Sequence, residues 1–285
     1  MSVEGAKGLE WVDAGGARTT LDVEGDEVLT AILAVWRRLL TALDELPDDC
    51  GDAPTRCSEW AVVDLVNHLA DVTGMAREVT FAAAQGKRSG IFDGFDPKRA
   101  PKLLTDAAVR DLDTARRRAR DALTAAVAEA EAGAALAQDL QVETPIGVQP
   151  FHAGLLHGFW DAWLHERDLL IPRGVTPPEL PSELRLHTMY SLHLAGCLQR
   201  MFGREASIVL VQEGVSDAAM RVDVQGTEVR TRLLPSLDGD AEALRGDATT
   251  VADALSGRGD LAAALRGPEA MRKAVRIVRT VIAGA

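Results

Sequence analysis

The pattern of apolar positions predicts four amphipathic helices in the first 175 residues. In each stretch apolar side chains recur every three or four residues, the spacing that lines one face of a helix. The stretches cover residues 27–46, 59–86, 106–131 and 150–170. Ser58 and Thr105 are suitable N-caps for the second and third helices, and Pro172 and Gly174 end the fourth. Four helices of this length, joined by connectors that allow an up-down arrangement, favour a helical bundle.

After residue 175 the pattern changes to a mixture of helix and strand. A proline-rich linker leads into a helix over 183–202, and the residues after it alternate as short strands do. The expected strands are 206–212, 220–224, 228–234 and 248–252. Gln225-Gly226 is the expected hairpin turn, and helices are expected again over 261–266 and 269–282. This region is therefore a smaller α+β domain.

The expected organisation has three parts. Residues 1–24 are rich in glycine and weakly patterned, so we expect an arm laid on the surface. Residues 25–175 form the helical bundle, and residues 182–285 form the α+β domain. The fold class is therefore mainly α.

Composition and charge exclude several classes of function. The chain has 285 residues, enough for two domains, and a net charge of -12, which disfavours a nucleic-acid or membrane-surface role. It has no apolar run of about 20 residues, and its first residues do not resemble a signal peptide. The three cysteines, Cys50, Cys57 and Cys197, show no CxxC spacing, as is typical of a protein from a reducing cytoplasm.

The fourth predicted helix contains candidate metal-binding residues. His157, Asp161 and His165 follow one another at intervals of four residues. At a rise of about 1.5 Å per residue, the two histidines are about 12 Å apart along the axis and cannot share one ion. Neighbouring members are about 6 Å apart, so Asp161 could bind a metal together with either histidine.

A third ligand must come from another helix. His68 shares a face of the second helix with Leu65, Leu69 and Val72, so it points toward the core. Two imidazoles and one carboxylate form the ligand set of a catalytic divalent-metal site with an open position. A histidine on an apolar helix face is also common as a hydrogen-bonded core residue, and spacing does not decide between these interpretations.

Other catalytic patterns are missing from the sequence. There is no Gly-x-Ser-x-Gly elbow, no phosphate-binding P-loop and no GxGxxG after a strand. Cys57 lies about 16 Å along the helix axis from His68, so we expect a buried small residue there and not a ligand. No protein nucleophile is assigned.

Two stretches resemble a known family. Residues 54–60, PTRCSEW, followed by 64–69, DLVNHL, resemble the first signature of the mycothiol-dependent maleylpyruvate isomerase family. Residues 144–147, TPIG, and the helix carrying 161–168, DAWLHERD, resemble the second. The resemblance extends over about residues 26–173 and implies a DinB/YfiT-like four-helix bundle. The C-terminal region resembles, more loosely, the family's sterol-carrier-like second domain.

The resemblance also implies a metal, usually zinc, and a thiol cosubstrate. The family's ligand positions fall on His68, Asp161 and His165, with Asp161 where the family usually has glutamate. Because aspartate is one methylene shorter, its helix must approach the metal more closely. The cosubstrate would be mycothiol, the low-molecular-weight thiol of actinobacteria, and the composition fits such a source.

The function we expect is that of a metal-dependent thiol transferase or thiol-assisted isomerase. A metal-bound thiolate would attack an electrophilic small molecule, and arginines of the C-terminal domain are candidates for binding its carboxylates. Two alternatives stay open: a metal-dependent hydrolase of the same superfamily, and a non-catalytic ligand-binding or regulatory module. No nucleic-acid or membrane partner is expected, and the oligomeric state is left undecided.

Overall fold

The computed structural model describes residues 8–12, 16–94, 109–133, 140–145, 147–214, 216, 218–235 and 242–281. The chain is mainly helical and divides into two compact units. One unit comprises Leu29–Pro178, and the other combines Met1–Val28 with Glu179–Ile282. Among the described residues, no helix has both the length and the apolar character that a bilayer span requires.

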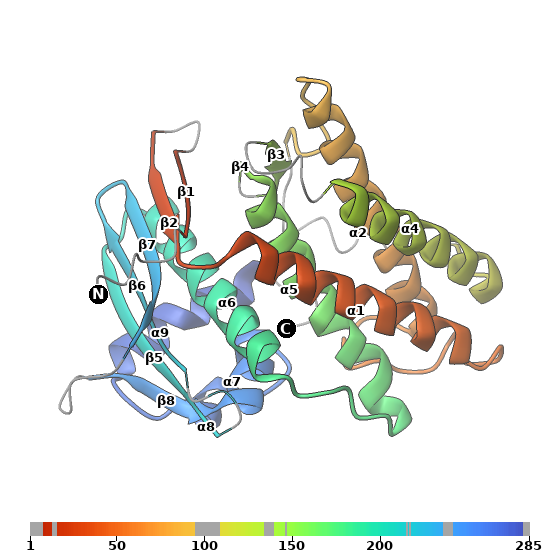
Figure 1. Cartoon of the computed structure of the whole chain (residues 1–285). Helices are drawn as coiled ribbons and strands as arrows, with labels where there is room; N and C mark the ends of the chain where they lie inside the picture. Colours follow the sequence, from red (N-terminus) through yellow and green to blue (C-terminus); the bar gives the residue numbers. More distant parts are fainter. Residues whose placement is uncertain are drawn as a thin grey trace, which may run out of the picture. The chain divides into compact units, whose positions relative to one another are not determined.

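The first unit contains the long helices that the sequence pattern predicts (Figure 1). They are α1 (Gly25–Glu45), α2 (Val62–Ala84), α4 (Leu112–Gly133) and α5 (Phe151–Leu170), with a 3-10 turn, η1 (Ile171–Arg173), after α5. Helix α2 packs against both α4 and α5. Ion pairs join α1 to α4 through Arg37 and Glu131, and α1 to α5 through Arg38 and Glu166. This packing places the inner faces of α2 and α5 side by side.

Helix α2 begins three residues later than predicted. Ser58 is not its cap; instead the Asp64 carboxylate accepts a hydrogen bond from the Ala61 backbone N–H at 3.1 Å. The preceding turn is held by the Thr55 hydroxyl, which donates to the backbone oxygen of Trp60 at 2.8 Å. Thr105, the cap expected for the third helix, lies outside the described residues.

A short hairpin lies in the connector that precedes α5. Strands β3 (Gln141–Thr144) and β4 (Gly147–Pro150) pair antiparallel. The Glu143 carboxylate accepts hydrogen bonds from the Ser89 hydroxyl and backbone N–H, the Gly90 N–H and Arg88 Nε, at 2.5 to 3.0 Å. The Ser89 hydroxyl is the main cause that lowers the pKa of Glu143 to about 2. This carboxylate therefore ties the hairpin to the segment that follows α2.

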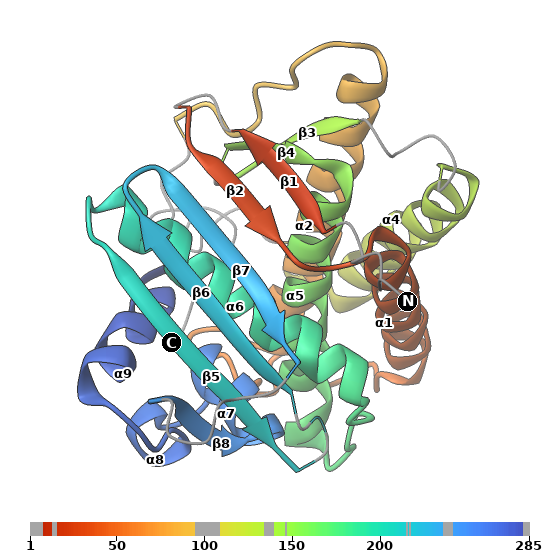
Figure 2. The same cartoon turned by 60° about the vertical axis from the view of Figure 1, so that its left-hand side comes forward.

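The second unit is a six-stranded mixed sheet with helices (Figure 2). Its strands are β1 (Leu9–Val12), β2 (Arg18–Leu21), β5 (Ala206–Glu213), β6 (Ala219–Gln225), β7 (Glu228–Leu234) and β8 (Leu244–Asp247), in the order β1-β2-β7-β6-β5-β8. Its helices are α6 (Pro181–Met201), α7 (Ala248–Leu255), α8 (Leu261–Ala264), α9 (Glu269–Val275) and the 3-10 helix η2 (Arg276–Val281). Helix α6 packs on β6 and β7, and a Cβ added at Gly196 would lie 2.6 Å from Val222 Cγ2. The glycine thus permits the close helix–sheet approach.

The structure of this unit confirms one predicted element and differs from the prediction at two others. The predicted hairpin is confirmed, but its turn residues are Gly226 and Thr227, one position later than Gln225-Gly226, since Gln225 pairs with Glu228. The strand predicted over 248–252 is wrong, because Asp247 caps a helix there by accepting the Thr250 N–H at 2.9 Å. Residues 9–12 and 18–21, expected in a surface arm, form strands, and β2 pairs in parallel with β7.

Candidate metal centre

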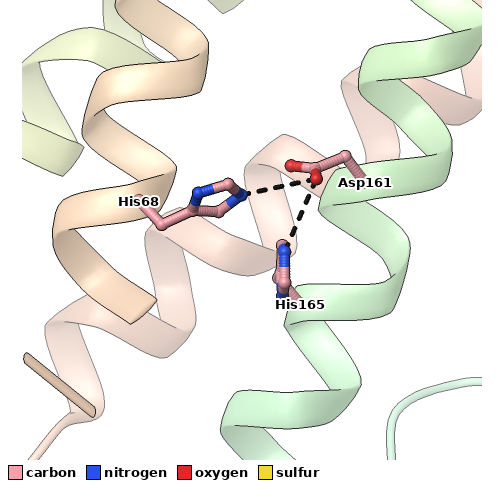
Figure 3. A group of neighbouring side chains, drawn as sticks. All are labelled: His68, Asp161 and His165. Atoms are coloured by element: carbon pink, nitrogen blue, oxygen red, sulfur yellow. Dashed lines mark hydrogen bonds and ion pairs between the residues drawn. The ribbon is translucent and has the colours of Figure 1, made fainter. Parts of the chain in front are cut away.

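The three residues predicted as metal ligands lie together in the helical unit (Figure 3). His68 projects from α2, and Asp161 and His165 project from one face of α5. His68 Nε2 lies 3.4 Å from Asp161 Oδ1, and His165 Nε2 lies 3.5 Å from the same oxygen. One potential ligand atom from each residue lies within 4.8 Å of the other two. Within the described ranges this is the one group of histidine, cysteine and acidic residues with metal-ligand spacing.

These separations fit a tetrahedral ion. Zinc binds imidazole nitrogen and carboxylate oxygen at about 2.0–2.2 Å, so two ligands of a tetrahedral site are about 3.4 Å apart. The two nitrogen–oxygen separations of 3.4 and 3.5 Å match that edge, and both are long for a strong hydrogen bond. Three protein ligands leave one position for water or substrate. The shorter aspartate arm reaches this arrangement because α2 and α5 are in direct contact.

A fourth residue, Asp168, fixes how His165 is oriented. Its Oδ2 lies 3.1 Å from His165 Nδ1, and its side chain is 0% exposed. With a proton on Nδ1 donated to this carboxylate, Nε2 faces Asp161 and can bind a cation once its own proton is lost. Carboxylate partners of this kind are usual for histidines that bind metals. Asp168 was not among the predicted site residues, although its i+3 spacing from His165 is visible in the sequence.

Trp60 forms an apolar wall beside both imidazoles. Its ring centroid lies 4.8 Å from that of His68 and 5.7 Å from that of His165. Both histidines are buried, whereas the Asp161 side chain keeps 20% of its surface exposed. Solvent therefore reaches the group from the carboxylate side. Cys57 is buried, as predicted, and does not belong to the group.

The electrostatics of the group favour bound positive charge. Burial alone would raise the pKa of Asp161, but His165 and His68 hold it well below its usual range. Burial likewise opposes protonation of His165, yet Asp161 and Asp168 raise the pKa of that imidazole to about 9. A carboxylate that stays ionised between two imidazoles is a suitable site for a cation, whose binding displaces the imidazole proton.

His157, the alternative partner of Asp161, is not part of the group. Its ring stacks on Trp160, with centroids 6.0 Å apart and planes inclined by 25°. Of the two histidines that spacing left open, His165 is the one that lies beside Asp161 and His68. The three residues fit a divalent metal ion in donor type and in their nitrogen–oxygen separations, and Asp168 orients one of them, His165.

Comparison with known proteins gives one family and one fold. Residues 32–170 match the family model described as the mycothiol maleylpyruvate isomerase N-terminal domain. The crystal structure of the mycothiol-dependent maleylpyruvate isomerase is similar, with a TM-score of 0.58 and 15% identity. A histidine-to-alanine mutant of that enzyme gives a TM-score of 0.60 at the same identity. Each match covers 86% of this chain and 93% of the other. A comparison with curated proteins finds no match.

Proposed function

Because residues 32–170 belong to the mycothiol maleylpyruvate isomerase N-terminal domain family, we propose that the chain is a divalent-metal-dependent, mycothiol-dependent isomerase or transferase. In this proposal the unit Leu29–Pro178 is a DinB-like four-helix bundle that carries the metal, and the other unit is a sterol-carrier-like domain. The substrates are a low-molecular-weight thiol and an electrophilic small molecule such as an α,β-unsaturated acid.

The observation that carries the proposal is the convergence of two imidazole nitrogens on one carboxylate oxygen. His68, Asp161 and His165 would hold the ion, most simply zinc, and Asp161 would neutralise one of its two charges. A divalent ion bound there lowers the pKa of a coordinated thiol or water and supplies a nucleophile at neutral pH.

The surrounding residues would prepare the site for this chemistry. Asp168 holds His165 in the tautomer that presents Nε2, so the ligand does not have to reorient when the ion binds. Trp60 covers the two imidazoles and excludes water from that side. The partly exposed side of Asp161 leaves the approach for thiol and substrate.

The thiol-assisted isomerisation balances without any further reagent. The thiolate sulfur forms a bond to one alkene carbon of the unsaturated acid, and the alkene π pair moves onto the conjugated carbonyl as an enolate. The carbon–carbon bond thereby becomes a single bond that can rotate. Loss of the same thiolate then breaks the carbon–sulfur bond and restores the alkene in the other geometry. The thiol is regenerated, so it is needed as a cosubstrate but is not consumed.

Assays with and without thiol test the proposal. The chain should isomerise maleylpyruvate only when mycothiol is present, and His68→Ala and His165→Ala should each abolish this activity. His157→Ala is the matched control: it is the same substitution on the helix of His165, outside the ligand group, and should retain most of the activity. Full isomerase activity without added thiol would overturn the thiol-dependent mechanism, and formation of hydrolysis products without thiol would favour a metal-dependent hydrolase.

A further inference from the structure

The side of the sheet opposite α6 carries a polar hollow. Along β6, Met220, Val222 and Val224 are buried, and the residues between them point to the other face. The hollow has a volume of about 250 Å³, close to the lower limit of sites for small organic ligands. Its lining consists of six residues from β6 and β7, and we name it the arginine hollow: Arg221, Asp223, Gln225, Glu228, Arg230 and Arg232.

The strand register sets two arginines against each other in the arginine hollow. Arg221 on β6 lies directly opposite Arg232 on β7, and Asp223 lies opposite Arg230. Like charges placed directly across an antiparallel pair destabilise it. The Arg221–Arg232 pairing is therefore unfavourable by itself, whereas Arg230 faces the opposite charge of Asp223.

Asp223 holds two of these guanidinium groups in place. Its Oδ1 accepts a hydrogen bond from Arg221 Nε at 2.8 Å, and its Oδ2 accepts one from Arg232 Nη2 at 3.5 Å. The Ser207 hydroxyl also donates to Asp223 Oδ1 at 2.8 Å and accepts from Arg221 Nη2 at 3.0 Å. Each guanidinium has five N–H donors, so both arginines keep donors for a ligand while their positions are fixed.

Arg230 is a cation whose cross-strand neighbour, Asp223, is hydrogen-bonded to Arg221 and Arg232. It is exposed, and no ion pair joins it to any residue in the described part of the chain. Glu228, at the turn end of β7, is the other charge of the hollow without a partner there. The hollow is therefore positive at the Arg221–Arg232 end and negative at the Gln225–Glu228 end.

We propose that the arginine hollow binds a small molecule through a carboxylate or phosphate oxyanion. The oxyanion accepts hydrogen bonds from Arg230 and from the free donors of Arg221 and Arg232, since planar guanidinium groups match two oxygens of such an anion. Glu228 opposes the anion and limits its affinity. The site belongs to the α+β unit and does not depend on the metal centre.

Isothermal titration of the full chain with inorganic phosphate and, separately, with succinate tests this proposal and distinguishes the two anions. At least one of them should bind with a stoichiometry of one, at constant ionic strength. Arg230→Ala should weaken binding about tenfold or more, the effect of losing a charge-assisted hydrogen bond. Glu228→Gln should strengthen it, a change in the opposite direction that misfolding would not produce.

Two controls separate this site from general charge effects and from the metal centre. Arg204→Ala removes an exposed arginine that stacks on Phe202, outside the hollow, and should leave anion binding unchanged. His165→Ala should also leave it unchanged. The proposal is overturned if neither anion binds at millimolar concentration, if Arg204→Ala weakens binding as much as Arg230→Ala, or if His165→Ala abolishes it.

Discussion

Replacing Asp168 tests whether His165 acts as a metal ligand through Nε2. Asp168 is fully buried, and its Oδ2 lies 3.1 Å from His165 Nδ1. Removing the outer partner of a metal-binding histidine costs about 10- to 100-fold in affinity, or about 1.4–2.7 kcal/mol. Asn still accepts the Nδ1 proton but lacks the charge, so we expect about tenfold weaker zinc binding for Asp168→Asn. Asp168→Ala removes both and should approach hundredfold.

Competition with a chelator of known affinity measures the loss of zinc affinity in both Asp168 variants. Thermal melts of the metal-free proteins show whether a loss of affinity comes from unfolding instead. Asp71→Asn is the matched control, because it removes one carboxylate charge from the same unit at an ion pair with Arg118. Its zinc affinity should equal that of the wild type. Wild-type affinity in Asp168→Ala would refute the reasoning, since the orientation of His165 would then not depend on this carboxylate.

Three further predictions concern stability and follow from buried charge, a depressed pKa and packing. Arg38→Met removes the guanidinium that donates two hydrogen bonds to the buried Glu166 carboxylate, and should lower the free energy of unfolding by about 3 kcal/mol. Urea unfolding measures this loss, and the double variant with Glu166→Gln should recover part of the lost stability. Because the pKa of Glu143 falls from 4.5 to about 2 on folding, its stabilisation is complete above pH 4.5 and is lost as the pH falls toward 2. Urea midpoints of Glu143→Gln should therefore change less over that range than those of the wild type, and equal slopes would contradict the cause given. Gly74→Ala places its Cβ in open space on α2 and should stabilise the protein by about 0.5–1 kcal/mol. Gly196→Ala on α6 places its Cβ 2.6 Å from a valine methyl and should destabilise the protein. Thermal melts that rank the two variants in the reverse order would contradict the packing described.

The periodicity of the sequence predicts the helices well because their apolar faces are local features. The helix expected over 150–170 is α5 (Phe151–Leu170), and the strand expected over 228–234 has the same bounds as β7. The start of α2 was less predictable, since Ser58 and Asp64 both offer capping oxygens and only tertiary context selects between them. Local propensity likewise favoured a strand at 248–252, where the Asp247 cap instead begins a helix.

The pairing of strands that are far apart in the chain could not be predicted from the sequence. Strand β2 pairs with β7 over a separation of 210 residues (228 − 18), and its four residues carry no strong strand pattern. In the candidate site, spacing on α5 gave Asp161 with either of two histidines. The choice of His165 depends on where His68 lies across the helix contact, which the family resemblance implied and the packing explains.

Metal content tests the central claim most directly. Elemental analysis of protein purified without chelator should find about one equivalent of zinc or a similar divalent metal in the wild type and in His157→Ala. His68→Ala and His165→Ala should each lose it, while circular dichroism shows unchanged helix content. Well under one equivalent in the wild type, or full metal in both ligand variants, would contradict the assignment of His68, Asp161 and His165 as the metal site.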